Sequence, residues 1–257
     1  MITPIEIRVD LEGGIADAID RSTADRRVKR RDVWFAEARP RPTGGSPTLM
    51  SSGIVIRMRT GEHYDDVSVE LRPCHPDQLS GRWAASFTEG DVRYRVSRRW
   101  HGETRAWSAC LTSRRPSGSL RAAAGPDGDI ATVLDSVQRQ FLISCTVHGV
   151  AVEHLVALGP IGWTKWKRVR LGDQEVEAER WSVADLDLVE LSLLVVPRPG
   201  ETPADLDDRA AAAQRRLEAR VRDGGSAIAA GETRTRLLGT LIARNRGDFR
   251  PDVGAQA

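Results

Sequence analysis

Six short segments of the sequence alternate charged residues with apolar or small ones, at a spacing that could build a charged binding site. Residues i and i+2 of a β-strand share a face, so each segment places two or three charges together. On a surface sheet such a face lies in water. In a closed sheet whose apolar side is covered by helices, the charges would line an ionic interior that binds a highly charged ligand. The segments are residues 6–10, 54–59, 69–72, 93–97, 163–167 and 175–179.

Composition sets limits on the class of protein. The chain has 257 residues, 40% of them hydrophobic and 29% charged, which is ordinary for one large or two small globular domains. Its net charge of +2, from 38 basic and 36 acidic residues, predicts no particular partner. Cys74, Cys110 and Cys145 show no metal-ligand or disulfide spacing, and no leader or membrane span is apparent. We expect a cytoplasmic, bacterial protein with free thiols and no membrane partner.

A basic run at residues 26–31 raises the question of nucleic acid. It lacks the interleaved aromatic side chains of a stacking platform, so the sequence favours a solvated strand entry, and a nucleic-acid partner is not expected.

The remaining pattern predicts strands, a helix, further strands, a second helix and a final strand. A short helical stretch at 15–22 and a loop at 39–51 precede the Arg57 strand, and residues 113–129 read as a linker or mobile loop. Apolar residues from Ile130 to Leu142 recur at helical spacing. Thr202, Pro203 and Gly224 mark the ends of a long helix. Residues 232–242 read as a last strand, which gives an α+β fold with a largely antiparallel sheet.

The order of these motifs resembles the CYTH superfamily, the triphosphate tunnel metalloenzymes. The resemblance covers roughly residues 2–242. It lies in an E-x-K-like start at Glu6–Arg8, an aromatic strand at 34–37, an aliphatic-R-x-R strand at 56–59 and a V-x-L-R-P segment at 69–73. Later matches are the small-residue strand at 106–111, the Gly159–Lys167 strand, acidic strands at 178–181 and 188–192, and a K-T-R-like segment at 231–236.

This resemblance implies an eight-stranded antiparallel β-barrel with flanking helices and a charged tunnel. It would form a single domain over residues 1–245 with the internal loop near 113–129, followed by a polar tail at 246–257. Activities in the family include triphosphate hydrolysis and adenylate cyclisation. Lys and Arg bind the phosphates there, and Glu holds Mg²⁺ or Mn²⁺, which suits the chemistry of hard cations and phosphate. The expected partner is a small anionic molecule, bound by a monomer or homodimer.

Carried over residue by residue, the resemblance assigns catalysis to Glu6 and Glu190 and metal binding to Glu6, Glu179 and Glu190. Phosphate binding falls to a basic set, with Arg93, Arg99 and Arg236 as further candidates. That set is Arg8, Arg57, Arg59, Arg72, Arg95, Lys165, Lys167 and Arg234.

Several carboxylates of the family pattern are replaced here, while the cations survive better. Pro4 and Ser192 stand where the two E-x-E pairs would be completed, Glu70 reverses an expected lysine, and Ser97 and Arg99 replace an acidic pair. Three functions therefore stay open. They are a metal-dependent triphosphate hydrolase with a reduced acidic site, a metal-independent binding protein or pseudoenzyme, and a tunnel enzyme for a non-phosphate organic substrate. The last is motivated by the tryptophans Trp163 and Trp166.

Overall fold

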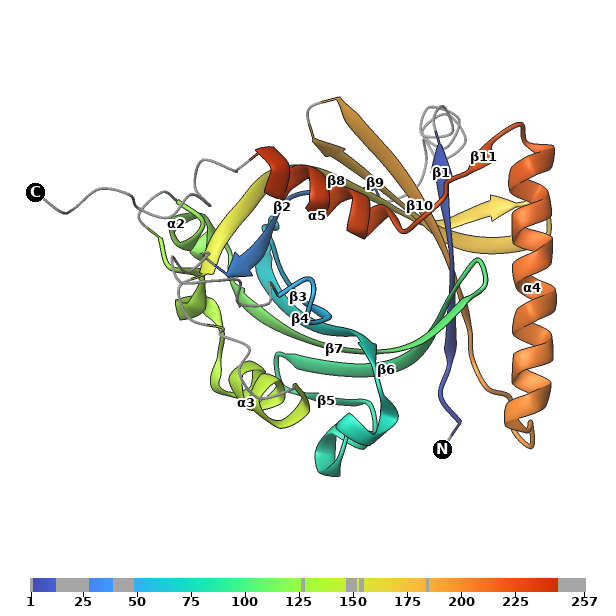
Figure 1. Ribbon diagram of the computed structural model, residues 1–257, viewed down its shortest axis with the longest axis horizontal. Helices are drawn as coiled ribbons and strands as arrows, with labels where there is room; N and C mark the ends of the chain where they lie inside the picture. The colour runs from blue at the N-terminus through green and yellow to red at the C-terminus, as the bar shows by residue number, and fades with distance from the viewer. Residues whose placement is uncertain are drawn as a thin grey trace, which may run out of the picture. The chain divides into compact units, whose positions relative to one another are not determined.

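The computed structural model describes residues 2–12, 28–38, 49–125, 128–146, 152, 155–183 and 185–244. The helical stretch expected at 15–22, the polar tail at 246–257 and most of the loop expected at 39–51 lie outside these ranges. The strands are β1 (Ile5–Glu12), β2 (Lys29–Ala38), β3 (Ile54–Arg59), β4 (Tyr64–Cys74), β5 (Phe87–Glu89), β6 (Val92–His101), β7 (Thr104–Pro116), β8 (Leu155–Leu171), β9 (Gln174–Val183), β10 (Leu186–Val195) and β11 (Ala227–Ile228). The helices are α2 (Ser119–Ala123), α3 (Ser136–Cys145), α4 (Pro203–Asp223) and α5 (Thr233–Arg244) (Figure 1).

The strands form one hydrogen-bonded ladder that closes on itself. Its order is β11-β1-β10-β9-β8-β2-β3-β4-β7-β6-β5, and a further pairing joins β1 to β6. Within the described ranges nine strands, β1 to β4 and β6 to β10, make the closed β-barrel, so the expected count of eight is wrong. A closed ring with an odd number of strands cannot alternate direction all the way round. The β1–β6 pair is accordingly parallel, whereas β1 and β10 are antiparallel.

The chain divides into two compact units. Unit 1 comprises Met1–Arg31, Ser97–Ala106 and Ile161–Leu237. It contains β1, β9, β10 and α4, with parts of β6 and β8. The helix packs its apolar row, including Leu206, Ala210 and Leu217, on the apolar side of the strands (Figure 1). That side carries Ile5, Ile7, Val9, Ala178 and Leu191, so the opposite side is left to the charged residues.

Unit 2 comprises Asp32–Val96, Trp107–Pro160 and Leu238–Ala257. Alternate residues of β3, β4 and β7 enter one apolar core, to which α3 contributes Phe141 and Leu142. Tyr94 and Trp83 pack edge to face in this core, with ring centroids 5.3 Å apart, and the Tyr94 hydroxyl donates to the Trp83 carbonyl. This hydrogen bond satisfies the buried phenol and fixes β6 against the turn at Gly81–Ala84.

The six charged strand segments are all confirmed, and so is the long helix. Thr202 caps α4 in a capping box with Asp205, and the helix ends at Gly224 as its sequence indicates. Helix α2 falls within the range read as a linker.

One expectation of secondary structure is confirmed in part and another is wrong. The helical pattern from Ile130 is divided, because the Asp135 side chain accepts a hydrogen bond from the Gln138 amide and starts α3 there. Residues 232–242 are not a strand, since α5 begins at Thr233. The alternating Thr and Arg residues suggested a strand, but Leu237, Leu238 and Leu241 are all buried at helical spacing.

Candidate functional site

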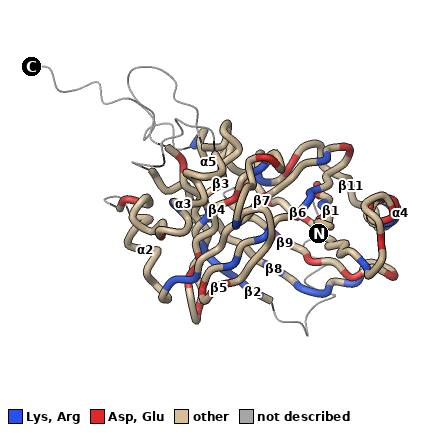
Figure 2. Tube along the Cα trace, turned by 90° about the horizontal axis from the view of Figure 1, so that it is seen from below, with Lys and Arg blue, Asp and Glu red and all other residues tan. Residues whose placement is uncertain are grey.

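One side of unit 1 gathers nine titratable side chains, and we call it the charged face. These side chains lie on five strands and alternate with residues that pack against α4. Because side chains two positions apart in a strand share a face, the alternation seen in the sequence brings them to one side. Both signs of charge occur on these strands (Figure 2). The face consists of Glu6, Arg8 and Asp10 on β1, Arg99 and His101 on β6, Lys165 on β8, Glu177 and Glu179 on β9, and Glu190 on β10.

Strand register arranges part of the charged face in a row. Lys165 lies opposite Glu179, Glu179 lies opposite Glu190, and Glu190 lies opposite Asp10. Glu190 therefore has an acidic neighbour on each side. Like charges directly opposite each other destabilise a sheet unless a cation offsets them.

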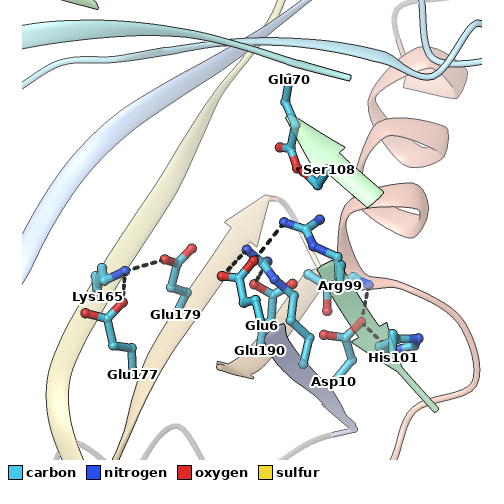
Figure 3. Close-up of polar contacts among 12 residues, drawn as sticks. Glu6, Asp10, Glu70, Arg99, His101, Ser108, Lys165, Glu177, Glu179 and Glu190 are labelled. Atoms are coloured by element: carbon cyan, nitrogen blue, oxygen red, sulfur yellow. Dashed lines mark hydrogen bonds and ion pairs between the residues drawn. The ribbon is translucent and has the colours of Figure 1, made fainter. Parts of the chain in front are cut away.

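Arg8 supplies that cation. One Nη of its guanidinium donates to Glu190 Oε1, and the other donates to Glu6 Oε1 at 3.1 Å. Arg99 donates to the second oxygen of Glu6 at 3.3 Å (Figure 3). Arg8 thus bridges the two carboxylates assigned to catalysis, and both of them are occupied by arginine.

Lys165 is held in the same manner on the neighbouring strands. Its Nζ lies 2.5 Å from a Glu177 oxygen and 2.9 Å from Glu179 Oε1 (Figure 3). The other Glu179 oxygen accepts a hydrogen bond of 3.0 Å from the Trp163 indole. Trp163 therefore faces the charged side. Trp166, three residues along the strand, points to the opposite side and is buried in the core under α4. The two tryptophans cannot form one aromatic platform.

Asp10 connects β1 to β6 and to the start of α5. It is 1% exposed, and its Oδ2 accepts a hydrogen bond of 2.5 Å from the Thr233 amide and lies 3.2 Å from His101 Nε2. The hydrogen bond to Asp10 raises the pKa of His101, against the opposing effect of burial.

The charged face carries more acid than base. Five carboxylates face three permanent cations, and burial and this excess together shift the pKa values of the buried groups. Burial opposes the charge of Arg8 and of Lys165, yet nearby carboxylates raise the pKa of both. Burial raises the pKa of Glu190, Asp10 and Glu179 raise it further, and Arg8 opposes them.

The residues present do not fit a divalent metal ion. Mg²⁺ and similar ions keep several waters and bind proteins through carboxylate oxygens, so a site needs carboxylates that are not already bonded to a cation. In the described part of the chain, no group of three or more His, Cys, Asp or Glu residues is placed to hold a metal. Glu6 and Glu190 are bridged by Arg8, and Glu179 is bonded to Lys165. An ion of charge two placed about 4 Å from Arg8 would be repelled by about 8 kcal/mol at an effective dielectric constant of ~20.

Four of the expected phosphate-binding residues lie in unit 2. Arg57 and Arg59 share one side of β3, away from the core, and Arg59 is ion-paired with Asp66 at 2.6 Å. Arg72 is partly buried near the end of β4, and Arg95 on β6 is exposed.

The last three expected phosphate-binding residues, and the glutamate that replaces an expected lysine at position 70, lie in different surroundings. Lys165 belongs to the charged face, whereas Lys167 is exposed, beyond a register shift in β8. Arg234 is buried on α5, which is a helix and not the expected strand. Glu70 is buried in unit 2 and accepts a hydrogen bond of 2.9 Å from the Ser108 hydroxyl.

Sequence reasoning assigned no site role to three members of the charged face, Asp10, His101 and Glu177. Asp10 follows Glu6 and Arg8 at the same spacing of two, so the alternation could have identified it. His101 lies opposite Arg8 across the parallel β1–β6 pair. That pairing joins strands about ninety positions apart, and no local signal reports it.

No model of a protein family matches the sequence, and no curated protein matches it. Among solved structures, a putative adenylyl cyclase from Hippeastrum with a dominant triphosphatase activity is similar, at a TM-score of 0.52 and 12% identity over 93% of this chain and 96% of that one. A Pyrococcus horikoshii protein, PH1819, matches at 0.42 with 12% identity, covering 91% and 98% of the two chains. A putative adenylate cyclase from Bacillus halodurans matches at 0.43 with 10% identity, covering 95% and 97%. With TM-scores below 0.5, the last two matches carry no weight for this chain.

The chain therefore has a CYTH-like fold, as the order of its motifs predicted. The likeness to the Hippeastrum structure concerns the fold alone. None of the described helices is both long and apolar enough to cross a membrane.

Proposed function

We propose that the protein binds a small phosphorylated or otherwise polyanionic molecule at the charged face. The observation that carries this proposal is the arrangement of Arg8 and Arg99 on the paired strands β1 and β6, with Lys165 on β8 of the same face, each held by carboxylates that a ligand can replace. The CYTH-like fold supports it, since the Hippeastrum protein of this fold has a triphosphatase activity. We propose the cytoplasm as the place where this occurs.

Binding on this face is an exchange of anions. Phosphate oxygens are stronger competitors for guanidinium and ammonium groups than water is, because the hydrogen bonds are charge-assisted. Glu190 is the carboxylate most readily displaced, since it is buried between Asp10 and Glu179 and its pKa is already raised. Protonation of Glu190 on arrival of the ligand would release Arg8. Affinity for a polyanion is therefore expected to increase as the pH is lowered toward the pKa of Glu190.

Glu6 and Glu190 remain the proposed catalytic residues if the ligand is also hydrolysed. A carboxylate with a raised pKa accepts a proton from water more readily than an ordinary one, which suits Glu190 to the role of general base. The Mg²⁺ or Mn²⁺ dependence expected from the family, with Glu179 as a third ligand, has no support in the arrangement of these carboxylates around Arg8 and Lys165. We assign no step of the chemistry to a metal.

The test is calorimetric titration with inorganic tripolyphosphate, with and without EDTA, alongside an assay of phosphate release. We expect Lys165→Met to weaken binding by at least about tenfold, the value of one charge-assisted contact or about 1.4 kcal/mol. Arg180→Met is the matched control, because Arg180 is ion-paired with Asp187 near the exposed hairpin end of β9 and β10. Equal affinity of wild type and Lys165→Met would place the ligand elsewhere. Phosphate release that survives in Glu190→Gln would refute the catalytic role of Glu190.

A further inference from the structure

The three carboxylates assigned to a metal by the sequence are the ones that act most strongly on Arg8. Glu190 and Glu6 accept hydrogen bonds from its two terminal nitrogens, and Glu179 adds to their electrostatic effect. Glu179 and Glu190 lie directly opposite each other in the β9–β10 ladder. Figure 3 shows Glu6, Glu179 and Glu190 on three adjoining strands of the charged face. The acidic groups are thus present, and the Arg8 guanidinium joins two of them, Glu6 and Glu190.

We propose that Arg8 serves as the built-in counter-ion of Glu6, Glu179 and Glu190, and that it excludes divalent cations from a cluster that would otherwise bind one. The wild-type protein then works without a metal, and the removal of one positive charge creates a divalent-cation site. This inference concerns the cluster itself and does not depend on which ligand the protein binds.

Two further observations agree with a cluster that is short of positive charge. Asp10 Oδ1 is buried and has no hydrogen-bond partner among the described residues, and Asp10 lies directly opposite Glu190. Lys165, the other cation beside Glu179, is itself shared between two carboxylates, with Nζ 2.5 Å from Glu177 and 2.9 Å from Glu179. Without Arg8, Glu190 would lose its cation and Glu6 would keep only Arg99, while Asp10 and Glu179 would still lie directly opposite Glu190. Hard divalent ions select such oxygen-rich sets.

The experiment is a titration with Mn²⁺ followed by electron paramagnetic resonance, in which the signal of the free aquo ion is lost as the ion binds. The chains compared are wild type, Arg8→Met, Arg8→Met with Glu190→Gln, and the control Arg180→Met. Methionine keeps much of the length of arginine and removes its charge. Arg180→Met removes an equal charge from an exposed ion pair whose two bonds are 2.7 and 2.8 Å.

We expect one Mn²⁺ per chain in Arg8→Met, at an affinity at least about tenfold above that of wild type, which corresponds to about 1.4 kcal/mol. Mn²⁺ and Mg²⁺ should also raise the melting temperature of this variant, because an ion that binds only the folded state stabilises it. The double variant and Arg180→Met should behave like wild type.

Two outcomes would overturn the inference. One is tight binding of Mn²⁺ by wild type, which needs no variant to observe. The other is an Arg8→Met chain that is folded by circular dichroism and binds Mn²⁺ no better than wild type. If Arg8→Met does not fold, Arg8→Gln, which keeps a hydrogen-bond donor without the charge, takes its place under the same criteria. Binding of tripolyphosphate is measured separately, so the failure of one proposal leaves the other standing.

Discussion

The two partners of the Arg8–Glu190 ion pair are predicted to respond in opposite ways when each is neutralised. Arg8→Met leaves Glu190, Glu6 and Glu179 close together without their shared cation. Loss of one partner of a buried pair costs about 3–5 kcal/mol, because the remaining charge is uncompensated. We expect a loss of this size, which is a large part of the roughly 5–15 kcal/mol that stabilises an ordinary domain.

Glu190→Gln should behave differently, because Arg8 keeps its bond to Glu6 at 3.1 Å. The substitution also relieves the repulsion from Asp10 and Glu179 and the cost of burying a carboxylate. We expect the free energy of unfolding at neutral pH to stay within about 1 kcal/mol of wild type or to rise above it.

The shifted pKa of Glu190 also determines how the difference in stability between wild type and Glu190→Gln changes with pH. The pKa of Glu190 in the folded chain lies above its ordinary value of 4.5, so between these two values the folded state holds the proton more firmly than the unfolded state. The stability of wild type relative to Glu190→Gln must then fall as the pH rises above 4.5. Urea unfolding followed by tryptophan fluorescence, at several pH values, measures both the size and the slope. A loss of about 3 kcal/mol or more in Glu190→Gln that grows with pH would refute this reasoning, since ionised Glu190 would then be net stabilising.

Three further results are expected. His101→Gln should lower stability by about 1–2 kcal/mol at acidic pH; because the pKa of folded His101 is above 6.5, this difference should be complete below pH 6.5 and disappear as the pH rises through the folded value. Burial raises the pKa of Cys74 and Cys145 to about 11, so a thiol reagent at neutral pH should leave both unmodified in the native chain and react with all three cysteines after unfolding. Leu217→Ala should cost about 2–5 kcal/mol in chemical unfolding, because Leu217 is fully buried between α4 and the sheet.

Each of these has a control. Modification rates in Cys110→Ser show whether the half-buried Cys110 accounts for any native reaction, and rapid native labelling of Cys74 or Cys145 would contradict their burial. Leu194→Ala removes a similar side chain that is 53% exposed, and an equal loss in both leucine variants would contradict the assigned packing of α4. A difference between wild type and His101→Gln that did not change with pH would mean that the imidazole acts only by packing.

The sequence predicted best where a local pattern decides the structure. The alternation of Glu6, Arg8 and Asp10 with Ile7 and Val9 reports which side of β1 faces α4, and no longer-range information is needed. The ends of α4 were predicted equally well, because the residues that cap a helix lie within one turn of its end.

The remaining predictions failed for two reasons. Some features depend on pairing between strands that are distant in the chain, and others on local sequence signals that favour different structures. The number of strands in the barrel depends on which strand meets β1, and that partner, β6, is distant in the chain. Residues 233–236 favour a strand by composition, but the burial of Leu237 and Leu241 makes α5 a helix. The role of Arg8 could not be read from its position either. Spacing alone does not show whether an arginine awaits a ligand or already neutralises Glu190.

The parallel pair that closes the ladder also determines how the barrel can open. Only four residue pairs, from Ile5 with Arg98 to Arg8 with His101, join β1 to β6, and their separation in the chain makes this a contact with a large loop-closure cost. The charged face reinforces this short seam, because Arg99 bonds Glu6 across it and His101 bonds Asp10 across it. Amide protons at Ile5 to Arg8 should therefore exchange with solvent through local opening of the seam, at rates that rise when either of these bonds is removed. A polyanion that bridges Arg8 and Arg99, as proposed above, would hold β1 and β6 together and slow that exchange.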